Sequence, residues 1–469
     1  MTLRVHRAIL TITTAVLPVA VLAADDNVAF IDQIGADNVA QIDQVGSLNQ
    51  VGLEADAALQ NGYYNQLSIS QTGARNQIGT EGSGLEQNGE LATPSVHNLI
   101  DVEQSSDENV VGEVIQSALG AIPGAANRLI IRQGGLNDNR ITRVYQIQED
   151  AMPGQVASVT QDGEGNVLAL LQQRSIAAQQ FQENRIVANF TGDFNGVYGL
   201  TGPALVTGVT SSALIQDTGY DGIGANGNEM DLAIQGNFNR FGIYQGGWMN
   251  SVGLLTIAGD GNELGVRQDG YENDLTMSTI FGDGNRVGID QIGTNRAFVT
   301  IIGQSDENDL LGIQEGTNDL SFYVEGNFNN VTVEQGYNTG LGGDNEASVS
   351  ITGSSNFFNL TQFGTNTAAI TVVGDSNNNS GAGLSGVAAI AGLTVGFLQQ
   401  TGAGNDFSAD ITGSSNLVAA AQTGDGNIAT LVVLGGGTNN QAAFLQGGSF
   451  NNAYVVQNGS GNIAGIIQN

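Results

Sequence analysis

Cysteine and lysine are both missing from this chain of 469 residues. Without cysteine, the chain has neither a disulfide framework nor a thiolate metal site. The 13 basic residues are all arginine, and 46 acidic residues outnumber them, which gives a formal net charge of −33. Nucleic acids and anionic membrane surfaces are polyanions, so this charge argues against both as partners.

Histidine and proline are scarce as well. Only His97 remains beyond the N-terminal segment, and it would have to serve any Ser-His-Asp triad. Zinc requires several histidines or cysteines, so we expect no catalytic residue, no metal ligand and no cofactor. Proline cannot donate to a sheet ladder, and a continuous stacked sheet should exclude it. The five prolines lie outside the repeats described below, at Pro18, Pro94, Pro123, Pro153 and Pro203.

Residues 1–24 have the composition of a secretory signal peptide. Arg4 and Arg7 precede a mostly apolar run over 8–20, and small residues follow it before Asp25. The apolar run is too short to span a bilayer. We therefore expect a secreted, extracellular protein without membrane insertion.

Glycine is abundant, with 68 residues, and one short sequence motif recurs along the chain. Residues 285–293 read NRVGIDQIG, which places Asn285, Val287, Ile289 and Gln291 on one side of an extended strand. The unit Asn-x-apolar-x-apolar-x-Gln/Ile/Val-x-Gly recurs less regularly over residues 25–227, for example at Asn166–Gln172, and almost without interruption over 228–469. A period of two over seven residues predicts strands.

The last residue of the unit alternates between Gln and Ile or Val from Ile234 to Val433, so the true repeat is two strands. This predicts an all-β fold: a β-solenoid of stacked two-strand rungs with two parallel, in-register sheets. Spacers before residue 227, such as 198–212, are expected to be loops that bulge from the rungs. The path over 375–399 stays open between a loop and an imperfect rung.

Two sets of residues carry the predicted structure. Stacked amides should form hydrogen-bonded ladders, and glycine supplies the bends because it adopts positive φ without strain. The ladder residues are Asn239, Gln245, Asn262, Gln268, Asn285, Gln291, Asn308, Gln314, Asn329, Gln335, Asn356, Gln362, Asn416 and Gln422. The turn residues are Gly247, Gly259, Gly270, Gly282, Gly293, Gly413 and Gly424.

Calcium is the main alternative interpretation of the turns. Gly-Asp-Gly-Asn sequences at Asp260, Asp283 and Asp425 are superficially similar to those of calcium-binding solenoids, which need a nine-residue period. The period here is longer, and turn chemistry alone accounts for the aspartates. Aromatic residues, including the single Trp248, are dispersed and do not line up as a carbohydrate platform. No pair of carboxylates stands out for glycoside cleavage.

The repeat resembles that of the curlin family, the subunits of bacterial extracellular functional amyloids. The pattern Gln-x-Gly-x-x-Asn-x-apolar-x-x-x-Gln appears as Gln33, Gly35, Asn38, Ala40 and Gln44 and recurs over nearly the whole chain. The resemblance implies a secretion channel, a nucleator subunit and polymerisation into curli-like fibres for adhesion and biofilm matrix. Many closing residues are Ile or Val where the family has Gln, lysine is absent, and the repeats are far more numerous.

Unpaired backbone groups at the ends of a solenoid are a template for another chain. The sequence stops at Gln468 and Asn469, at the end of a repeat unit with no polar cap, so we expect end-to-end assembly with copies of itself. We therefore expect a structural subunit that is not an enzyme. The alternatives are a monomeric extracellular β-solenoid that binds a surface, glycan or calcium and, more distantly, a polysaccharide-degrading β-helical enzyme.

Overall fold

The structure is a computed structural model that describes residues 26–82, 84–89, 98–119, 127–149, 154–175, 183–218, 227–275, 279–301, 306–336, 343–378, 381, 383–434 and 436–469. The predicted signal peptide, His97, and three of the prolines, Pro94, Pro123 and Pro153, lie outside the described residues. The described chain divides into two compact units. The first comprises residues up to Gly199 with Val209–Leu254, and the second Leu200–Gly208 with Leu255–Asn469.

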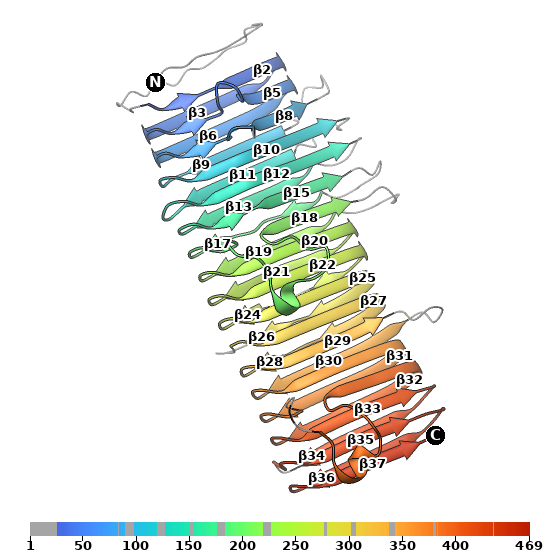
Figure 1. Cartoon of the computed structure of the whole chain (residues 1–469). Helices are drawn as coiled ribbons and strands as arrows, with labels where there is room; N and C mark the ends of the chain where they lie inside the picture. Colours follow the sequence, from blue (N-terminus) through green and yellow to red (C-terminus); the bar gives the residue numbers. More distant parts are fainter. Residues whose placement is uncertain are drawn as a thin grey trace. The chain divides into compact units, whose positions relative to one another are not determined.

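Parallel strands make up almost all of both units (Figure 1). Successive strand segments alternate between two faces, called face A and face B, and each strand pairs with the strand of the same face one rung earlier and one rung later. The predicted all-β, solenoid-like fold is therefore confirmed. Several long strands, such as β25 (Arg286–Phe298), pass through the corner and contribute to both faces.

In the first unit, face A contains β1 (Val28–Ala29), β2 (Ile31–Ala36), β4 (Gln50–Val51), β5 (Ala58–Tyr63), β7 (Gln77–Ile78), β8 (Leu85–Gly89), β10 (Val110–Leu119), β12 (Arg140–Glu149), β14 (Val167–Leu168), β15 (Leu170–Ser175), β18 (Ala213–Thr218) and β20 (Arg240–Trp248). Face B contains β3 (Val39–Ser47), β6 (Asn65–Ala74), β9 (Asn98–Gln104), β11 (Asn127–Gly134), β13 (Val156–Asp162), β16 (Arg185–Ile186), β17 (Phe190–Thr191), β19 (Glu229–Gln235) and the first part of β21 (Ser251–Ala258), which continues into the second unit after Leu254.

In the second unit, face A contains β22 (Glu263–Tyr271), the first halves of β25 and β27 (Asp309–Ser321), β29 (Asn330–Gly336), the first halves of β31 (Phe357–Val373) and β32 (Phe397–Thr412), β33 (Leu417–Thr423), β35 (Gln441–Gln446) and β37 (Ile463–Gln468). Face B contains the second halves of the long strands with β23 (Asp274–Leu275), β24 (Thr279–Phe281), β26 (Thr300–Ile301), β28 (Val324–Glu325), β30 (Asp344–Thr352), β34 (Ile428–Leu434) and β36 (Asn452–Asn458).

The register follows the repeat. Gln268 pairs with Gln291, and Gln291 pairs with Gln314 on the next rung. Side chains that alternate inward along these strands are fully buried, as in Val287 and Ile289 of β25. A strand of this length has no core of its own, so stacking of like rungs supplies it.

One spacer behaves differently from the loop predicted for it. Residues 200–208, which we call the strap, lie flat against the outer surface of face A in the second unit and contain the short helix η1 (Gly202–Ala204). A Cβ atom on Gly265 would lie 1.9 Å from the Ala204 carbonyl oxygen, and one on Gly288 1.9 Å from that of Pro203. The strap packs there because two outward positions carry glycine.

Residues 375–399, for which the sequence allows either a loop or an imperfect rung, interrupt one face-A strand segment. Asn377 and Gln400 hold the two ends of that segment in their stacks, while the chain between them includes α1 (Gly386–Ala389). Ala388 and Ala391 of this excursion pack with Ala443 of β35. The insertion therefore leaves its own rung intact and covers the outer surface of two later strands, β35 and β37.

Candidate assembly site: the amide ladders

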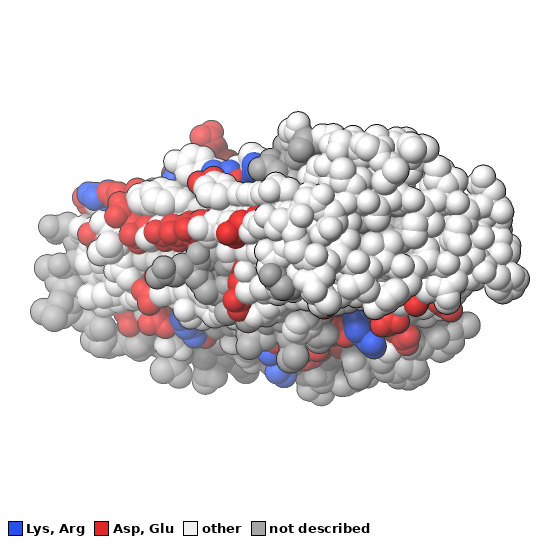
Figure 2. All heavy atoms as spheres, turned by 90° about the horizontal axis from the view of Figure 1, so that it is seen from below, with Lys and Arg blue, Asp and Glu red and all other residues white. Residues whose placement is uncertain are grey.

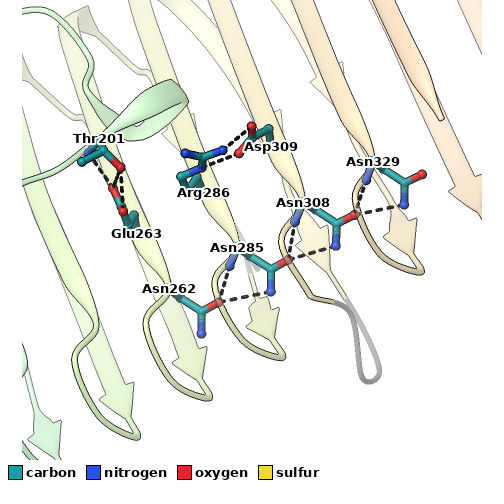
Figure 3. A network of polar contacts seen from close by, with 8 residues as sticks. All are labelled: Thr201, Asn262, Glu263, Asn285, Arg286, Asn308, Asp309 and Asn329. Carbon is teal, nitrogen blue, oxygen red and sulfur yellow. Dashed lines mark hydrogen bonds and ion pairs between the residues drawn. The ribbon is translucent and has the colours of Figure 1, made fainter. Parts of the chain in front are cut away.

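The asparagines that open the strands form a continuous hydrogen-bonded stack (Figure 3). Asn285 donates its Nδ2 and its backbone N–H to Asn262 Oδ1, at 3.1 and 2.9 Å. Asn308 repeats both bonds to Asn285, at 2.9 and 3.1 Å, and Asn329 repeats them to Asn308, at 3.0 and 2.9 Å. Each side chain thus satisfies a backbone donor of the next rung.

The same asparagines also hold the turns. Asn308 Nδ2 donates to the carbonyl of Gly326 at 2.8 Å, and Asn329 Nδ2 to that of Gly353 at 2.8 Å. The residue before each asparagine has positive φ, 54° at Glu307 and 59° at Phe328, which a non-glycine residue adopts only where its surroundings require it. The hydrogen bonds of the following asparagine side chain hold the backbone in this conformation.

A second stack runs through the glutamines at the closing end of each face-A segment. Gln268 Nε2 donates to Gln291 Oε1 at 2.9 Å, and the same bond joins Gln291 to Gln314 and Gln314 to Gln335, each at 3.0 Å. The remaining Nε2 hydrogen lies near two backbone carbonyls, as in Gln314, whose Nε2 is 3.0 Å from Arg296 O and 3.1 Å from Asn318 O. Every amide therefore donates in one direction along the stack.

All predicted ladder residues occupy these stacks and are at most 1% exposed. Asn239 and Gln245 belong to the first unit, where Asn239 bonds to Asn195 and Gln216 bonds to Gln245. In the second unit the stacks continue through Asn356, Gln362, Asn416 and Gln422. Buried amides are expensive unless they are paired, and here the pairing comes from the repeat itself.

The predicted turn glycines all have positive φ, between 86° and 136°. These residues are Gly247, Gly259, Gly270, Gly282, Gly293, Gly413 and Gly424. Space is also restricted at these corners, since a Cβ atom on Gly293 would lie 2.5 Å from the carbonyl oxygen of Gly316. Both the conformation and the close stacking of the corners therefore require glycine.

The aspartates of the Gly-Asp-Gly-Asn turns take part in a third stack. Asp283 Oδ1 accepts the N–H of Asp260 at 2.7 Å, and Asp425 Oδ1 accepts that of Ala403 at 2.9 Å. Ser414 fills the same role with its hydroxyl, which accepts the N–H of Asp375. Among the described residues, no group of three or more His, Cys, Asp or Glu is arranged to hold a metal ion.

Several residues of the stacks were not predicted, because they do not match the six-residue spacing of the sequence pattern. Insertions or an extra residue inside the strand segment break the six-residue spacing while leaving both ends stacked. Asn195 and Gln216 are one such pair, and the prediction that Gln172 follows Asn166 was wrong, because Gln173 is the stacked residue. A second signal would have found Asn195: the turn Gly192-Asp-Phe-Asn195 precedes it, although no glutamine follows at the expected distance.

Ion pairs connect neighbouring rungs on the outer surface. Arg286 donates to both carboxylate oxygens of Asp309 at 2.6 Å (Figure 3). Glu263 binds the strap instead: it accepts from the Thr201 backbone N–H at 2.5 Å and from the Thr201 hydroxyl (Figure 3). Burial raises the pKa of the Asp290 carboxyl, an effect that Arg267, 3.6 Å away, partly offsets. Acidic side chains also gather in rows in the view of Figure 2, where basic ones are few.

Aromatic residues in the first unit are less dispersed than the sequence suggested. Phe194 and Phe238 stack with ring centroids 5.4 Å apart, Tyr198 lies 6.5 Å from Phe238, and Arg240 lies over the Tyr198 ring. Tyr198 and Phe238 are exposed. The sequence missed this cluster because the three aromatic residues come from two adjacent rungs and a spacer.

No helix in the described part of the chain has the length and apolar character needed to cross a membrane. Comparison with known proteins gives no relative: no family model matches this chain, and no curated protein matches it significantly.

Proposed function

We propose that this chain is a secreted structural subunit without enzymatic activity that assembles with copies of itself into curli-like extracellular fibres for cell adhesion and biofilm matrix. The observation that carries the proposal is the directional amide stack. In the stacks described above, Asn285, Asn308, Gln291 and Gln314 each use one group toward the rung before and another toward the rung after, so each added rung restores the same binding surface. The curlin-like repeat supports the same function, together with a secretion channel and a nucleator as partners.

An uncharged stretch of the second unit supports self-association. Residues 426–469 contain no charged side chain, and Figure 2, viewed from the side where the last strands lie, shows a broad uncharged area. A second copy could stack there without desolvating charge.

Assembly of the purified protein tests this proposal. Sedimentation and electron microscopy should show fibres whose growth accelerates between about 0.05 and 0.5 M salt, because salt screens repulsion between acidic copies. Protein that stayed monomeric for weeks at high concentration and high salt would contradict the proposal.

A backbone variant tests whether the ladder itself is needed. Val333 is fully buried in β29 and pairs with Gly312 and Leu360. Val333→Pro removes a donor from a continuous stack and should cost about 3 kcal/mol or more, with slower fibre growth. Val333→Ala keeps the N–H and is the control. Equal growth of the two variants would show that the ladder does not limit assembly.

A monomeric extracellular solenoid that binds a glycan is the second candidate. The exposed Tyr198 and Phe238 favour it, since exposed aromatic rings offer apolar faces on which a sugar ring can pack. Binding of soluble oligosaccharides by calorimetry, lost in Tyr198→Ala, would support this candidate.

A further inference from the structure

In the second unit the chain covers parts of face A with segments of its own. The strap lies on two outward glycines of β22 and β25, and the excursion that contains α1 lies on β37 in the same way. A Cβ atom on Gly465 would lie 2.2 Å from the Val387 carbonyl oxygen. The Ser385 N–H donates to Gln441 Oε1 at 2.6 Å, which ties the excursion to β35 as well. Both segments therefore occupy outward positions of face A.

Face B of the neighbouring rungs carries apolar side chains on its outer surface. Strands β34 and β36 pair in register. Their outward apolar residues, which we call the face-B patch, are Ile428, Val432, Leu434, Tyr454 and Val456. Four of the five are between 40% and 65% exposed, and Val432 is half-buried. The described chain thus leaves this apolar surface open to solvent, while it covers the outer surface of β35 and β37.

Charge indicates which partner suits the face-B patch. The chain has a formal net charge of −33, yet residues 426–469 contain no charged side chain. Copies of the chain repel one another over their acidic surfaces, and this repulsion is weakest where no charge is present. A basic partner would gain nothing from an uncharged surface and would be attracted to acidic surfaces instead. The partner that suits the patch is therefore a second copy with the same uncharged surface.

The size of the face-B patch decides in which state it acts. Two neighbouring strands of about seven residues offer a surface of roughly 200 Å², far less than the approximately 800 Å² that each partner contributes to a stable complex. One patch therefore does not hold two free subunits together. In the proposed fibre the patch recurs once per subunit at a constant spacing, and a second fibre has the same spacing, so many weak contacts form together.

We propose that the face-B patch is the lateral contact between fibres, and that its occupant is the same patch of a second fibre. The two sheets then face each other about 10 Å apart with interdigitated side chains, as packed sheets do. The strap and the α1 excursion cover face A, so fibres join in pairs and not in larger bundles. This proposal rests on the proposed self-assembly and adds an interaction surface to it.

The mass per unit length of the fibres, measured by scanning transmission electron microscopy, tests the lateral contact. At about 0.5 M salt, where repulsion is screened, fibres of the unsubstituted protein should have twice the mass per length of a single fibre. Val456→Asp places a charge in the contact and should give single fibres, a twofold lower value. Thr332→Asp is the matched control, because it adds the same charge at an outward, half-buried position of β29 in face A. Its fibres should remain paired.

A second variant changes the contact in the opposite direction and leaves the face-B patch unsubstituted. Asp406 and Asp410 of β32 are exposed and border the patch, since both pair with residues of β34. In Asp406→Asn/Asp410→Asn, half of the fibres should be paired at a salt concentration at least twofold lower than in the unsubstituted protein. Glu315→Gln/Glu334→Gln removes two charges from face A and should shift this concentration less. Equal shifts in both variants would overturn the contact even if the first variant failed to fold.

The outcomes separate this proposal from the proposed function. Single fibres of the unsubstituted protein at every salt concentration would overturn the lateral contact and leave self-assembly intact, and so would equal pairing of Val456→Asp and Thr332→Asp. Phosphatidylcholine vesicles that bound single fibres, and bound Val456→Asp fibres at least tenfold less, would assign the patch to a lipid surface and overturn the proposal. Absence of fibres from the unsubstituted protein would overturn the proposed function itself.

Discussion

The early rungs of the first unit differ from the rungs of the second unit at the closing position of face B, where glutamine gives way to apolar side chains from Phe190 and Ile234 onward. In the early rungs this position holds a ladder of Gln71, Gln104 and Gln133, in which each Nε2 donates to the next Oε1 at 2.8 to 2.9 Å. In the second unit the same position holds Ile301, Val324 and Ile351, stacked in register and fully buried. The opening position holds stacked asparagines in both units, with one exception at Gln155, whose side-chain amide has no hydrogen-bond partner in the described structure.

The difference separates two roles for stacked amides. A closing glutamine mainly satisfies its own buried amide, so a column of aliphatic side chains can replace a column of glutamines. An opening asparagine satisfies the backbone N–H of the next rung and a turn carbonyl, which no aliphatic side chain can do. The four predictions below follow this distinction, from the largest expected effect to the smallest.

Removal of an opening asparagine should have the largest effect. Asn308→Ala leaves the N–H of Asn329 and the carbonyl of Gly326 without partners in a buried turn. Each buried unsatisfied group costs about 1–3 kcal/mol, so chemical denaturation should show a loss on the order of 3–5 kcal/mol. Asn330→Ala, at an exposed neighbouring position, is the control and should change stability by less than about 0.5 kcal/mol.

Interruption of the glutamine ladder should cost less. Gln133→Leu leaves the Gln104 amide and the Gln161 carbonyl oxygen unpaired at this point, a loss of about 2 kcal/mol. The triple replacement of Gln104, Gln133 and Gln161 by Leu removes partners together and should recover part of this loss. A triple variant less stable than the sum of its single variants would show that the glutamine column is not interchangeable with an aliphatic one.

The reverse substitution tests the other unit. Val324→Gln places one amide between Ile301 and Ile351, where no neighbouring side chain can pair with it. We expect a loss of about 1–2 kcal/mol in denaturant unfolding, with Val324→Leu as the matched control. A stabilising Val324→Gln would contradict the distinction drawn between the two units.

Acidification should have the smallest effect. Burial raises the pKa of Asp290, and that of Asp217, above the ordinary aspartate value. The folded state therefore binds these protons more tightly, so stability should rise as pH falls from neutral through the raised pKa values and should gain nothing more below the unfolded value of about 3.9. The slope of unfolding free energy against pH should flatten in Asp290→Asn and in Asp217→Asn, and an unchanged slope in both variants would contradict this account.

Most of the fold and of the amide stacks could be predicted from the sequence because the repeat is local and periodic. The strands, their register and the ladders through Asn285 and Gln291 follow from a seven-residue pattern that each rung repeats. The strap could not be predicted in this way, because its packing depends on Gly265 and Gly288, which lie far from it in the sequence. Segments with insertions, such as Asn195 to Gln216, were missed because stacking preserves their ends and not their spacing.

X-ray diffraction from aligned fibres of the purified protein tests the central claim most directly. Continued stacking of rungs across copies predicts a meridional reflection near 4.8 Å along the fibre axis. Fibres that lacked this reflection, or that placed it on the equator, would contradict assembly through the amide ladders.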